Sequence, residues 1–570
     1  MKFWVLSVAN TLLAYASLLA ISAPCFADEI DFEGRPSDPA SLRAEAFVAA
    51  QGAVTTGAAV ALAKVSAAFA SGGGKIAELE REREPLAQRL AGLERRYMDL
   101  VGSDAPEATR LRDRLSRESQ ELRIRIGAIE DQISAENPGY YELTRPAALE
   151  LDEVQGLLND DEAILLLLVS DDATYSFAVS DDSIEWSRSV DLRETPLAGK
   201  VAALRRSLGA ESGRGTVAEP LGAPRTRFDS TGAHELYTEL VKPVESIFTG
   251  KRVVMSVTTA TLSSLPLQLL VTSPATSEQE TQYLADRYAM TSLPSVSSLK
   301  ALRCLLVEPG QQHRGCRGNS VGRARVASNG EFKLVGYGAP TLLGDGGIER
   351  GAQNFEDASK GNLADTNYLR GLDYLPGTKR ELEALEAFYG PARAIVRTGE
   401  QATEKAIKSA VELKGARYVV FSTHGLLAGK AGVQGEPGLV FTPPSEETKS
   451  ELDDGLLTAS EASRLTLSAE FVVLSACNTG ASDGRDGADG LSGLARAFLF
   501  AGARSLLVSH WEVNDQATRE LITRTFSALD ESGARDRAEA LQKAMRSVRS
   551  TPGWTSPRFW AAFTLVGVPE

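Results

Sequence analysis

Two short apolar runs in the last third of the chain each end at a residue suited to acid–base or nucleophilic chemistry. The first begins at residue 417 and ends at His424 and Gly425, and the second begins at residue 471 and ends at Cys477. A thiol is weakly ionised at neutral pH and becomes a strong nucleophile when a nearby imidazole takes its proton. We therefore predict that Cys477 is a nucleophile and that His424 is its base.

Both runs have the composition of strands that are buried on both faces of a parallel sheet, since they are short, largely apolar and rich in β-branched residues. Reactive groups in such sheets collect beyond the carboxyl ends of the strands. Predicted helices, among them one that begins after a Pro-Gly turn at residues 376–377 and one over residues 403–413, alternate with the predicted strands. We expect a mainly parallel sheet with helices on both faces. The N–H groups of Gly425 and Cys477 would then donate to an oxyanion at one edge of the sheet.

These two blocks resemble the CHAT domain, a bacterial branch of the caspase- and separase-like cysteine peptidases. Residues 454–461, 490–503 and 505–515 also match the family, and His424 and Cys477 match its dyad. The separation of 53 residues (477 − 424 = 53) is close to the roughly 50-residue gap of caspase-type proteases. The resemblance implies a caspase-like fold and a cysteine endopeptidase that cleaves a protein substrate through a thioester, without a metal or an organic cofactor.

Three more residues are candidates for contacts with the substrate. Asp483 belongs to an Asp- and Gly-rich stretch that could form an acidic rim, although the spacing does not match an EF-hand calcium loop. Asp515 and His510 lie in a region that borders the specificity pocket in the wider clan. A structural role is the alternative for each of them. For the whole domain, the alternatives are a catalytically inert caspase-like interaction scaffold and an amidase or acyltransferase with the same thiol chemistry.

The first 27 residues have the features of a secretory signal. Lys2 precedes an apolar stretch over residues 3–21, and small residues lie before a cleavage position after Ala27. We expect a mature protein in the periplasm or outside the cell. An uncleaved segment that anchors the chain in a membrane is the alternative.

Export would permit a disulfide bond. Cys304 and Cys316 flank a short loop and could pair, which would leave Cys477 as a free thiol in the mature chain. Spacing alone does not establish such a bond, because the geometry of the two side chains decides it.

Residues 28–137 are predicted to be helical, beginning at Pro39, with an antiparallel coiled-coil-like hairpin over residues 75–134. Apolar residues at alternating spacings of three and four form the seam of each helix. The hairpin is either a structural spacer or an arm that docks a protein partner. The seam consists of Ile76, Leu79, Leu86, Leu90, Leu93, Tyr97 and Leu100 in the first helix and Leu111, Leu115, Leu122, Ile126, Ile129 and Ile133 in the second.

The rest of the chain divides into a first α/β subdomain over residues 138–330 and a caspase-like catalytic subdomain over residues 331–570. Gly336 and Gly338 resemble the start of a dinucleotide-binding turn, but Thr341 replaces the third glycine, so we predict no nucleotide site. The net charge of −15 and the sequence pI of about 5.1 argue against a nucleic-acid partner.

Overall fold

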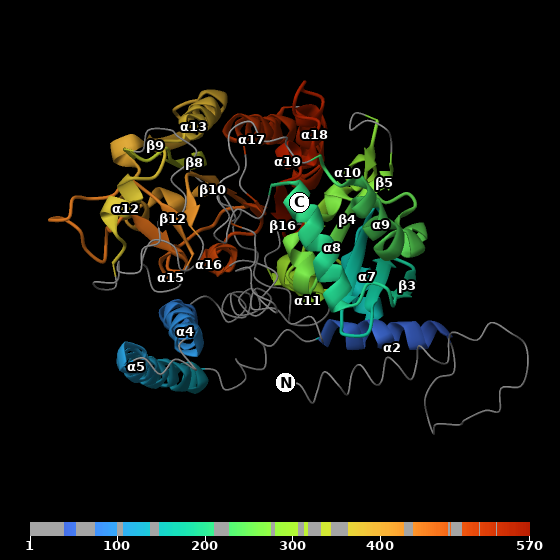
Figure 1. The fold of residues 1–570 in the computed structure, drawn as a ribbon, viewed down its shortest axis with the longest axis horizontal. Coiled ribbons are helices and arrows are strands. Elements are labelled where there is room, and N and C mark those ends of the chain that lie inside the picture. Colours follow the sequence, from blue (N-terminus) through green and yellow to red (C-terminus); the bar gives the residue numbers. More distant parts are fainter. Residues whose placement is uncertain are drawn as a thin grey trace, which may run out of the picture.

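Eleven strands form one continuous sheet that extends across both predicted α/β subdomains (Figure 1). The strand order is β3-β2-β1-β4-β7-β16-β15-β14-β10-β8-β9. The computed structural model of the chain describes residues 39–52, 75–99, 106–136, 148–209, 227–274, 280–305, 313–316, 332–343, 363–426, 437–476, 479, 493–511, 514–531 and 533–570. The predicted signal segment, residues 1–27, lies outside these residues.

Nine of the eleven strands form two parallel blocks that run in opposite directions, and β2 and β3 pair antiparallel at one edge of the sheet. The strands β1, β4, β7 and β16 are parallel to one another, as are β15, β14, β10, β8 and β9, and the blocks meet where β15 pairs antiparallel with β16. The sheet strands are β1 (Glu162–Val169), β2 (Thr174–Ser180), β3 (Ile184–Ser189), β4 (Val253–Thr258), β7 (Ala289–Ser292), β8 (Phe332–Gly338), β9 (Ala394–Thr398), β10 (Ala416–Ser422), β14 (Phe471–Ser475), β15 (Leu506–Ser509) and β16 (Phe563–Val566).

Helices cover both faces of the second block, as β10 illustrates. Tyr418 and Val420 face a core shared with α13 and α17, whereas Val419 and Phe421 face a core shared with α16. The predicted fold, a mainly parallel sheet with helices on both faces, is confirmed. The helices are α2 (Pro39–Gly52), α4 (Lys75–Asp99), α5 (Pro106–Glu136), α7 (Leu151–Leu157), α8 (Glu194–Ser207), α9 (Ser230–Leu240), α10 (Leu284–Arg287), α11 (Val296–Lys300), α12 (Thr366–Arg370), α13 (Pro376–Tyr389), α14 (Glu404–Lys408), α15 (Ala459–Ala462), α16 (Gly493–Ala501), α17 (Asp515–Asp530), α18 (Arg537–Arg549) and α19 (Pro557–Trp560).

Two small sheets accompany the large one. The strands β11, β12 and β13 form a three-stranded sheet beside the end of β10, and β5 pairs with β6. None of the described helices combines the length and the apolar character that a membrane span requires. The small strands are β5 (Val271–Ser273), β6 (Gln282–Tyr283), β11 (Gly425–Leu426), β12 (Gly438–Val440) and β13 (Leu456–Thr458).

The prediction of one helix over residues 403–413 is wrong. The helix α14 ends at Lys408, and a separate 3-10 turn covers Glu412–Lys414. The N–H of Ala410 donates to the carbonyl of Ile407, three residues before it, at 3.1 Å. This tighter turn closes the helix directly after Ser409.

Gly336 and Gly338 serve packing, which explains their spacing without a nucleotide. A Cβ on Gly338 would lie 2.0 Å from the carbonyl oxygen of Ser422 on β10, and a Cβ on Gly336 would lie 2.8 Å from the side chain of Leu382 on α13. The absence of side chains therefore allows β8 to lie close to both neighbours.

The helices α4 and α5 pack along the predicted apolar seam. Their buried residues include Leu79, Leu86 and Leu93 from one helix and Leu122 and Ile129 from the other. Leu100 and the side chains of Ile76 and Tyr97 lie outside the described part of the chain.

Charged side chains beside the seam form ion pairs within the hairpin. Arg83 is only 5% exposed and forms ion pairs with Glu80, Glu84 and Glu130, and Arg89 pairs with Glu118.

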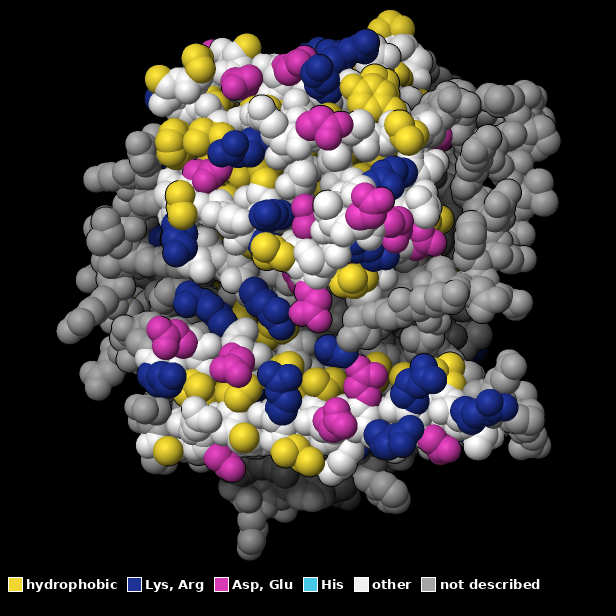
Figure 2. Space-filling view, turned by 90° about the vertical axis from the view of Figure 1, so that its left-hand side faces the viewer, with side chains coloured by type: hydrophobic (Ala, Val, Ile, Leu, Met, Phe, Trp, Pro, Cys, Tyr) yellow, Lys and Arg dark blue, Asp and Glu magenta, His cyan; other side chains and the backbone are white. Residues whose placement is uncertain are grey.

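The hairpin packs against the second predicted α/β subdomain through α4 and α15. The hydroxyl of Ser460 on α15 donates to the carbonyl of Pro85 in α4 at 3.4 Å. Figure 2 shows the face that carries the hairpin, where Lys and Arg side chains are interspersed with Asp and Glu side chains. The hairpin thus contacts the sheet domain, as the spacer alternative expects, and keeps a charged outer surface.

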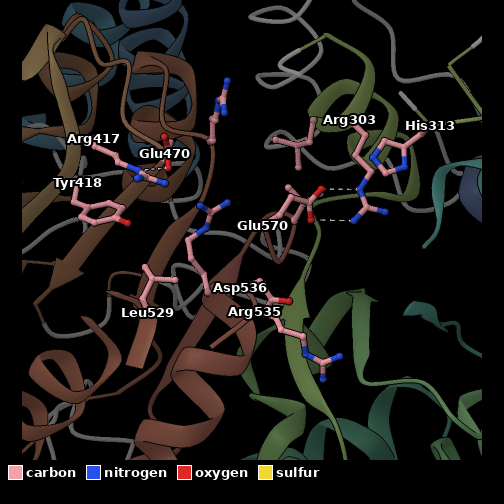
Figure 3. Close-up of a pocket in the computed structure, with 13 residues that line it drawn as sticks. Arg303, His313, Arg417, Tyr418, Glu470, Leu529, Arg535, Asp536 and Glu570 are labelled. Carbon is pink, nitrogen blue, oxygen red and sulfur yellow. Dashed lines mark hydrogen bonds and ion pairs between the residues drawn. The ribbon is translucent and has the colours of Figure 1, made fainter. Parts of the chain in front are cut away.

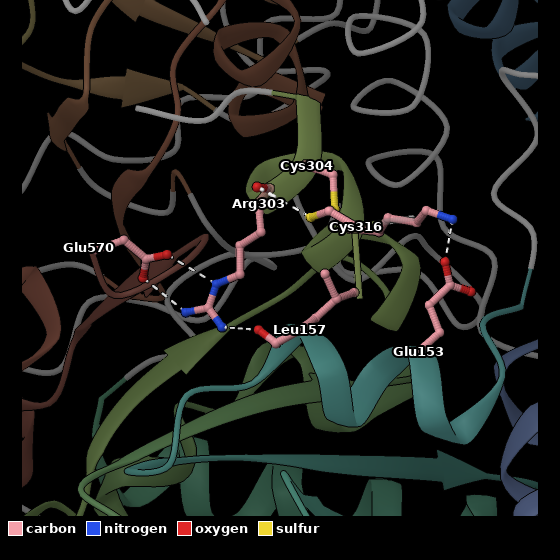
Figure 4. The surroundings of a disulfide bond; sticks show 7 residues. Glu153, Leu157, Arg303, Cys304, Cys316 and Glu570 are labelled. Carbon is pink, nitrogen blue, oxygen red and sulfur yellow. Dashed lines mark hydrogen bonds and ion pairs between the residues drawn. A yellow bond between two sulfur atoms is a disulfide. The ribbon is translucent and has the colours of Figure 1, made fainter. Parts of the chain in front are cut away.

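Cys304 and Cys316 form a disulfide bond, with Cα atoms 5.4 Å apart (Figure 4). The bond ties residues 313–316 to the helical turn that follows α11. The same short segment also packs on α7, where the N–H of Gly315 donates to the carbonyl of Gly156 at 2.8 Å. The predicted pairing is confirmed.

Removal of this bond in a Cys304→Ser, Cys316→Ser double variant should lower the free energy of unfolding by about 3 kcal/mol, because the bond closes a loop with a sequence separation of 12. Denaturant unfolding would measure the loss. Reductant should destabilise the wild type by a similar amount and leave the double variant unchanged. Equal sensitivity of the two proteins to reductant would contradict this assignment.

Candidate active site

The strands β10 and β14 bring the two predicted reactive segments to one edge of the sheet. They pair in parallel, and Ser422, the last residue of β10, lies opposite Ser475, the last residue of β14. His424 follows Ser422 by two residues, and Cys477 follows Ser475 by two residues. Cys477 itself lies outside the described residues, so the described part of the site is His424 and its surroundings.

One nitrogen of the His424 ring is committed to a backbone carbonyl. Nε2 lies 2.7 Å from the carbonyl oxygen of Asp373, in the loop between α12 and α13. Because a carbonyl can only accept, Nε2 carries the hydrogen, and the lone pair of the neutral ring is then on Nδ1. The half-buried ring is thereby oriented with Nδ1 as the atom that can take a proton.

The backbone around Gly425 leaves its N–H out of the adjoining ladder. The N–H of Val440 donates to the carbonyl of His424 at 3.0 Å, and Gly425 lies opposite Leu439. In an antiparallel ladder, hydrogen-bonded pairs alternate with pairs that are not hydrogen-bonded. Gly425 and Leu439 therefore form a pair of the second kind, and the Gly425 N–H points away from β12. This orientation is compatible with the predicted role as an oxyanion donor.

The residues on both sides of Cys477 are anchored to β15. The hydroxyl of Ser509 donates to the carbonyl of Ala476, and the N–H of Ser509 donates to Oγ1 of Thr479 at 3.0 Å. Ala476 and Thr479 are both buried. The chain that carries the predicted nucleophile is thus fixed before and after it, as a preorganised site requires. Asp483 lies outside the described residues.

Asp515 lies near His424 but is engaged with backbone. It is the first residue of α17, and its Oδ2 accepts the N–H of Gly377 at 2.6 Å. Burial raises the pKa of Asp515, while the N–H of Gly377 and the nearby charges of Arg380 and Arg519 oppose the rise. Asp515 therefore connects α17 to the start of α13, beside the loop that holds the imidazole.

His510 is placed differently from the other predicted residues. It is 6% exposed, and its Nε2 lies 3.1 Å from Oγ1 of Thr564 on β16. Burial lowers the pKa of His510 to about 3, so the ring is neutral at physiological pH. This placement favours the structural alternative for His510.

Glu381 is a buried carboxyl that the sequence analysis missed. It lies on α13, is 2% exposed, and accepts the hydroxyl of Ser475 at 3.1 Å. Burial raises the pKa of Glu381 to about 8, against the hydroxyls of Ser422 and Ser475, which favour its charged form. Its position was readable in the sequence, because Glu381 precedes Leu382 and lies one helical turn before Leu385 on the buried face of α13.

Metal ligands are not clustered in the described part of the chain. Within it, no three or more His, Cys, Asp or Glu residues are arranged to hold a metal ion. The described residues instead offer a proton acceptor, a backbone N–H that points away from β12 and two strand ends held in register.

Comparison with known proteins gives a family match and several partial similarities. A family model described as CHAT domain matches residues 231–568. Tetratricopeptide repeat protein 28 of Mus musculus is 41% identical over 112 residues, which are 20% of this chain and 4% of that protein. The Homo sapiens protein of the same name is 33% identical over 194 residues, covering 30% of this chain and 8% of that protein. The chain spans less than a tenth of the length of either relative.

Some solved structures are distantly similar to this chain. A Saccharomyces cerevisiae separase–securin complex matches with 10% identity and a TM-score of 0.42, covering 82% of this chain and 34% of the other. The Arg-specific cysteine proteinase gingipain R matches with 12% identity and a TM-score of 0.34, covering 62% of this chain and 69% of the other.

Proposed function

This chain belongs to the CHAT domain family, and we propose that it is a cysteine endopeptidase whose dyad is His424 and Cys477. The observation that carries the proposal is the register of β10 and β14, which places the residues two before each dyad member directly opposite each other. The orientation of the imidazole by the carbonyl of Asp373 adds support, because it leaves Nδ1 to accept a proton.

The reaction would proceed through a thioester. The thiol of Cys477 gives its proton to Nδ1 of His424, and Sγ forms a bond to the carbonyl carbon of the substrate. The carbon–nitrogen bond then breaks, and the proton passes from Nδ1 to the leaving amine. A water molecule hydrolyses the thioester. The N–H groups of Gly425 and Cys477 would hold the oxyanion, and loss of one such donor typically costs about 10²–10³ in rate. The chemistry needs no metal or organic cofactor.

The proposed location is the periplasm or the cell exterior. The features of a secretory signal over residues 1–27 support export, and the bond between Cys304 and Cys316 suits an oxidising compartment. A membrane would be involved only if the signal segment stayed uncleaved. Protein is the proposed class of substrate.

A catalytically inert interaction scaffold is the second candidate. Similarity to a protein named for tetratricopeptide repeats, together with a helical hairpin whose outer surface is charged, favours a role in binding another protein. In that case α4 and α5 would present a docking surface for a protein partner, and the region around His424 would not turn over a substrate.

Labelling with a peptidyl electrophile, followed by mass mapping of the modified residue, separates these candidates. Labelling of Cys477 in the folded wild type, and its loss in Cys477→Ala, is the expected result. A Cys477 that reacts only after denaturation would overturn the peptidase and support the scaffold. Reactive Cys477 without cleavage of any member of a peptide library would instead indicate an amidase or acyltransferase.

A further inference from the structure

A cavity of about 220 Å³ lies at the edge of the sheet opposite His424 (Figure 3). Figure 3 shows Arg417, Tyr418 and Glu470 on one side of it and Arg303, His313 and Glu570 on the other. The seven-residue strand β10 separates the cavity from the candidate active site, a distance of roughly 20 Å at about 3.3 Å per residue. The cavity is smaller than the roughly 300–1,000 Å³ of a pocket for a drug-sized ligand, so it suits a small molecule or ion.

Arginines outnumber acids in the wall of the cavity. Five arginines line it (Arg303, Arg417, Arg504, Arg535 and Arg537), against three acids (Glu470, Asp536 and Glu570). Two of these arginines also pair with acids outside the wall, Arg303 with Glu162 at 2.6 Å and Arg535 with Glu539 at 3.0 Å. Burial and the neighbouring charge of Arg303 lower the pKa of His313, which keeps that ring neutral at physiological pH.

Each acid in the wall already has an arginine partner. Glu470 pairs with Arg417 at 2.6 Å and Glu570 with Arg303 at 3.0 Å. Asp536 pairs with Arg252, which lies outside the cavity wall, at 2.6 Å. The acids therefore have little capacity left to neutralise a further cation.

Among the described residues, Arg537 lines the cavity without an acid partner. Its side chain is 7% exposed and, in the described part of the chain, makes no ion pair, and Nε is buried without an acceptor. Burial lowers the pKa of Arg537, and the acids Glu470 and Glu570 act on it only at a distance. A buried guanidinium without an acceptor is costly, and a bound anion would remove that cost.

We propose that this cavity binds a phosphate dianion, either free or as the terminal group of a small phosphomonoester. The Arg537 guanidinium would provide the central fork of donors, which matches the geometry of phosphate oxygens. Tyr418 would add a neutral hydroxyl, because burial raises its pKa to about 12 and keeps it protonated. The anion would contact the start of β10, the start of α18 and the residues that follow β16. Because β10 and β16 belong to different blocks of the sheet, the anion would link the two blocks.

Thermal unfolding and calorimetry of the full chain in a phosphate-free buffer test the proposal. Inorganic phosphate is expected to raise the midpoint of unfolding by at least about 2 °C near saturation, whereas chloride at the same ionic strength is not. Glycerol phosphate in a parallel titration shows whether the site accepts a monoester as well as the free ion. A wild type that shows neither heat of binding nor a phosphate-specific shift overturns the proposal.

Three variants locate the site. Arg537→Met should lose the phosphate response and, without phosphate, should be at least as stable as the wild type, because it removes an unpaired buried charge. Arg537→Lys, which keeps the charge but not the fork, should bind phosphate at least about tenfold more weakly. Arg524→Met removes an exposed arginine that pairs with Glu520 on α17, and it should respond like the wild type. A full phosphate shift in Arg537→Met would place the anion elsewhere and overturn the assignment. If Arg537→Met does not fold, the Arg537→Lys titration decides.

Discussion

Replacement of His424 by alanine is expected to slow electrophile labelling of Cys477 about 10- to 100-fold at pH 6 and to change the pH dependence of the reaction. Without a base, Cys477 would react as an ordinary thiol with a pKa near 8.5, of which roughly one part in 300 is ionised at pH 6. A thiolate of higher pKa is intrinsically more nucleophilic, which recovers part of this loss. The labelling rate of the variant should therefore rise about tenfold per pH unit up to roughly pH 8.5, whereas that of the wild type should be nearly level between about pH 6 and pH 8.

Two further variants separate the chemical role of His424 from its structural role. His424→Gln keeps an N–H that can donate to the carbonyl of Asp373, where Nε2 donates at 2.7 Å, but supplies no base. It should behave like the alanine variant. His234→Gln is the matched control, since the Nδ1 atom of His234 likewise lies 2.8 Å from a backbone carbonyl, that of Val271, and is remote in the sheet from β10. A level pH dependence in both His424 variants would exclude His424 as the base.

The strands that carry the candidate dyad could be predicted because their signal is local. A short apolar run of β-branched residues specifies a buried strand wherever it pairs, and β10 and β14 were found in this way. The order of the strands is not local. The pairing of the last strand, β16, with β7 across some 270 residues, and the reversal of direction between β15 and β16, depend on contacts that no sequence window contains.

For the candidate site, too, the sequence indicated the residue types but not the contacts that depend on the fold. The chemistry proposed for His424 follows from its residue type and its spacing from Cys477, whereas the sequence did not indicate that Gly425 begins the short strand β11. The carbonyl of Asp373 was not predictable, because any residue supplies a carbonyl and only the loop between α12 and α13 brings this one to the imidazole. For His510 the residue type was misleading. A histidine suggested a contact with the substrate, but this side chain is buried against Thr564 of β16.

We expect the buried carboxyl of Glu381 to make the free energy of unfolding strongly dependent on pH. Burial raises its pKa from the ordinary value of 4.5 to about 8 in the folded protein. Between these two values the unfolded chain loses the proton and the folded protein retains it, so the free energy of unfolding falls as the pH rises. The fall amounts to about 1.4 kcal/mol per pH unit, or about 5 kcal/mol in all, and it is complete above pH 8.

Glu381→Gln mimics the protonated form and should abolish this fall. The variant and the wild type should be about equally stable near pH 4.5, and the variant should be more stable by several kcal/mol at pH 8.5, as measured by denaturant unfolding across this range. Glu383→Gln changes an exposed residue of the same helix, which pairs with Lys379 at 3.8 Å, and should differ little from the wild type at any pH. A gap between Glu381→Gln and the wild type that does not grow with pH would contradict the assigned titration.

The titration of Glu381 also bears on the proposed nucleophile. Its carboxyl contacts Ser475, two residues before Cys477, from beneath the ends of the paired strands. A negative charge at this position would oppose formation of a thiolate nearby, because like charges disfavour each other in a site of low dielectric. A carboxyl that stays neutral up to about pH 8 leaves the thiol free to ionise at physiological pH. We therefore expect the labelling rate of wild-type Cys477 to decline above pH 8 relative to that of Glu381→Gln, and equal rates in the two proteins at pH 9 would show that Glu381 acts on stability alone.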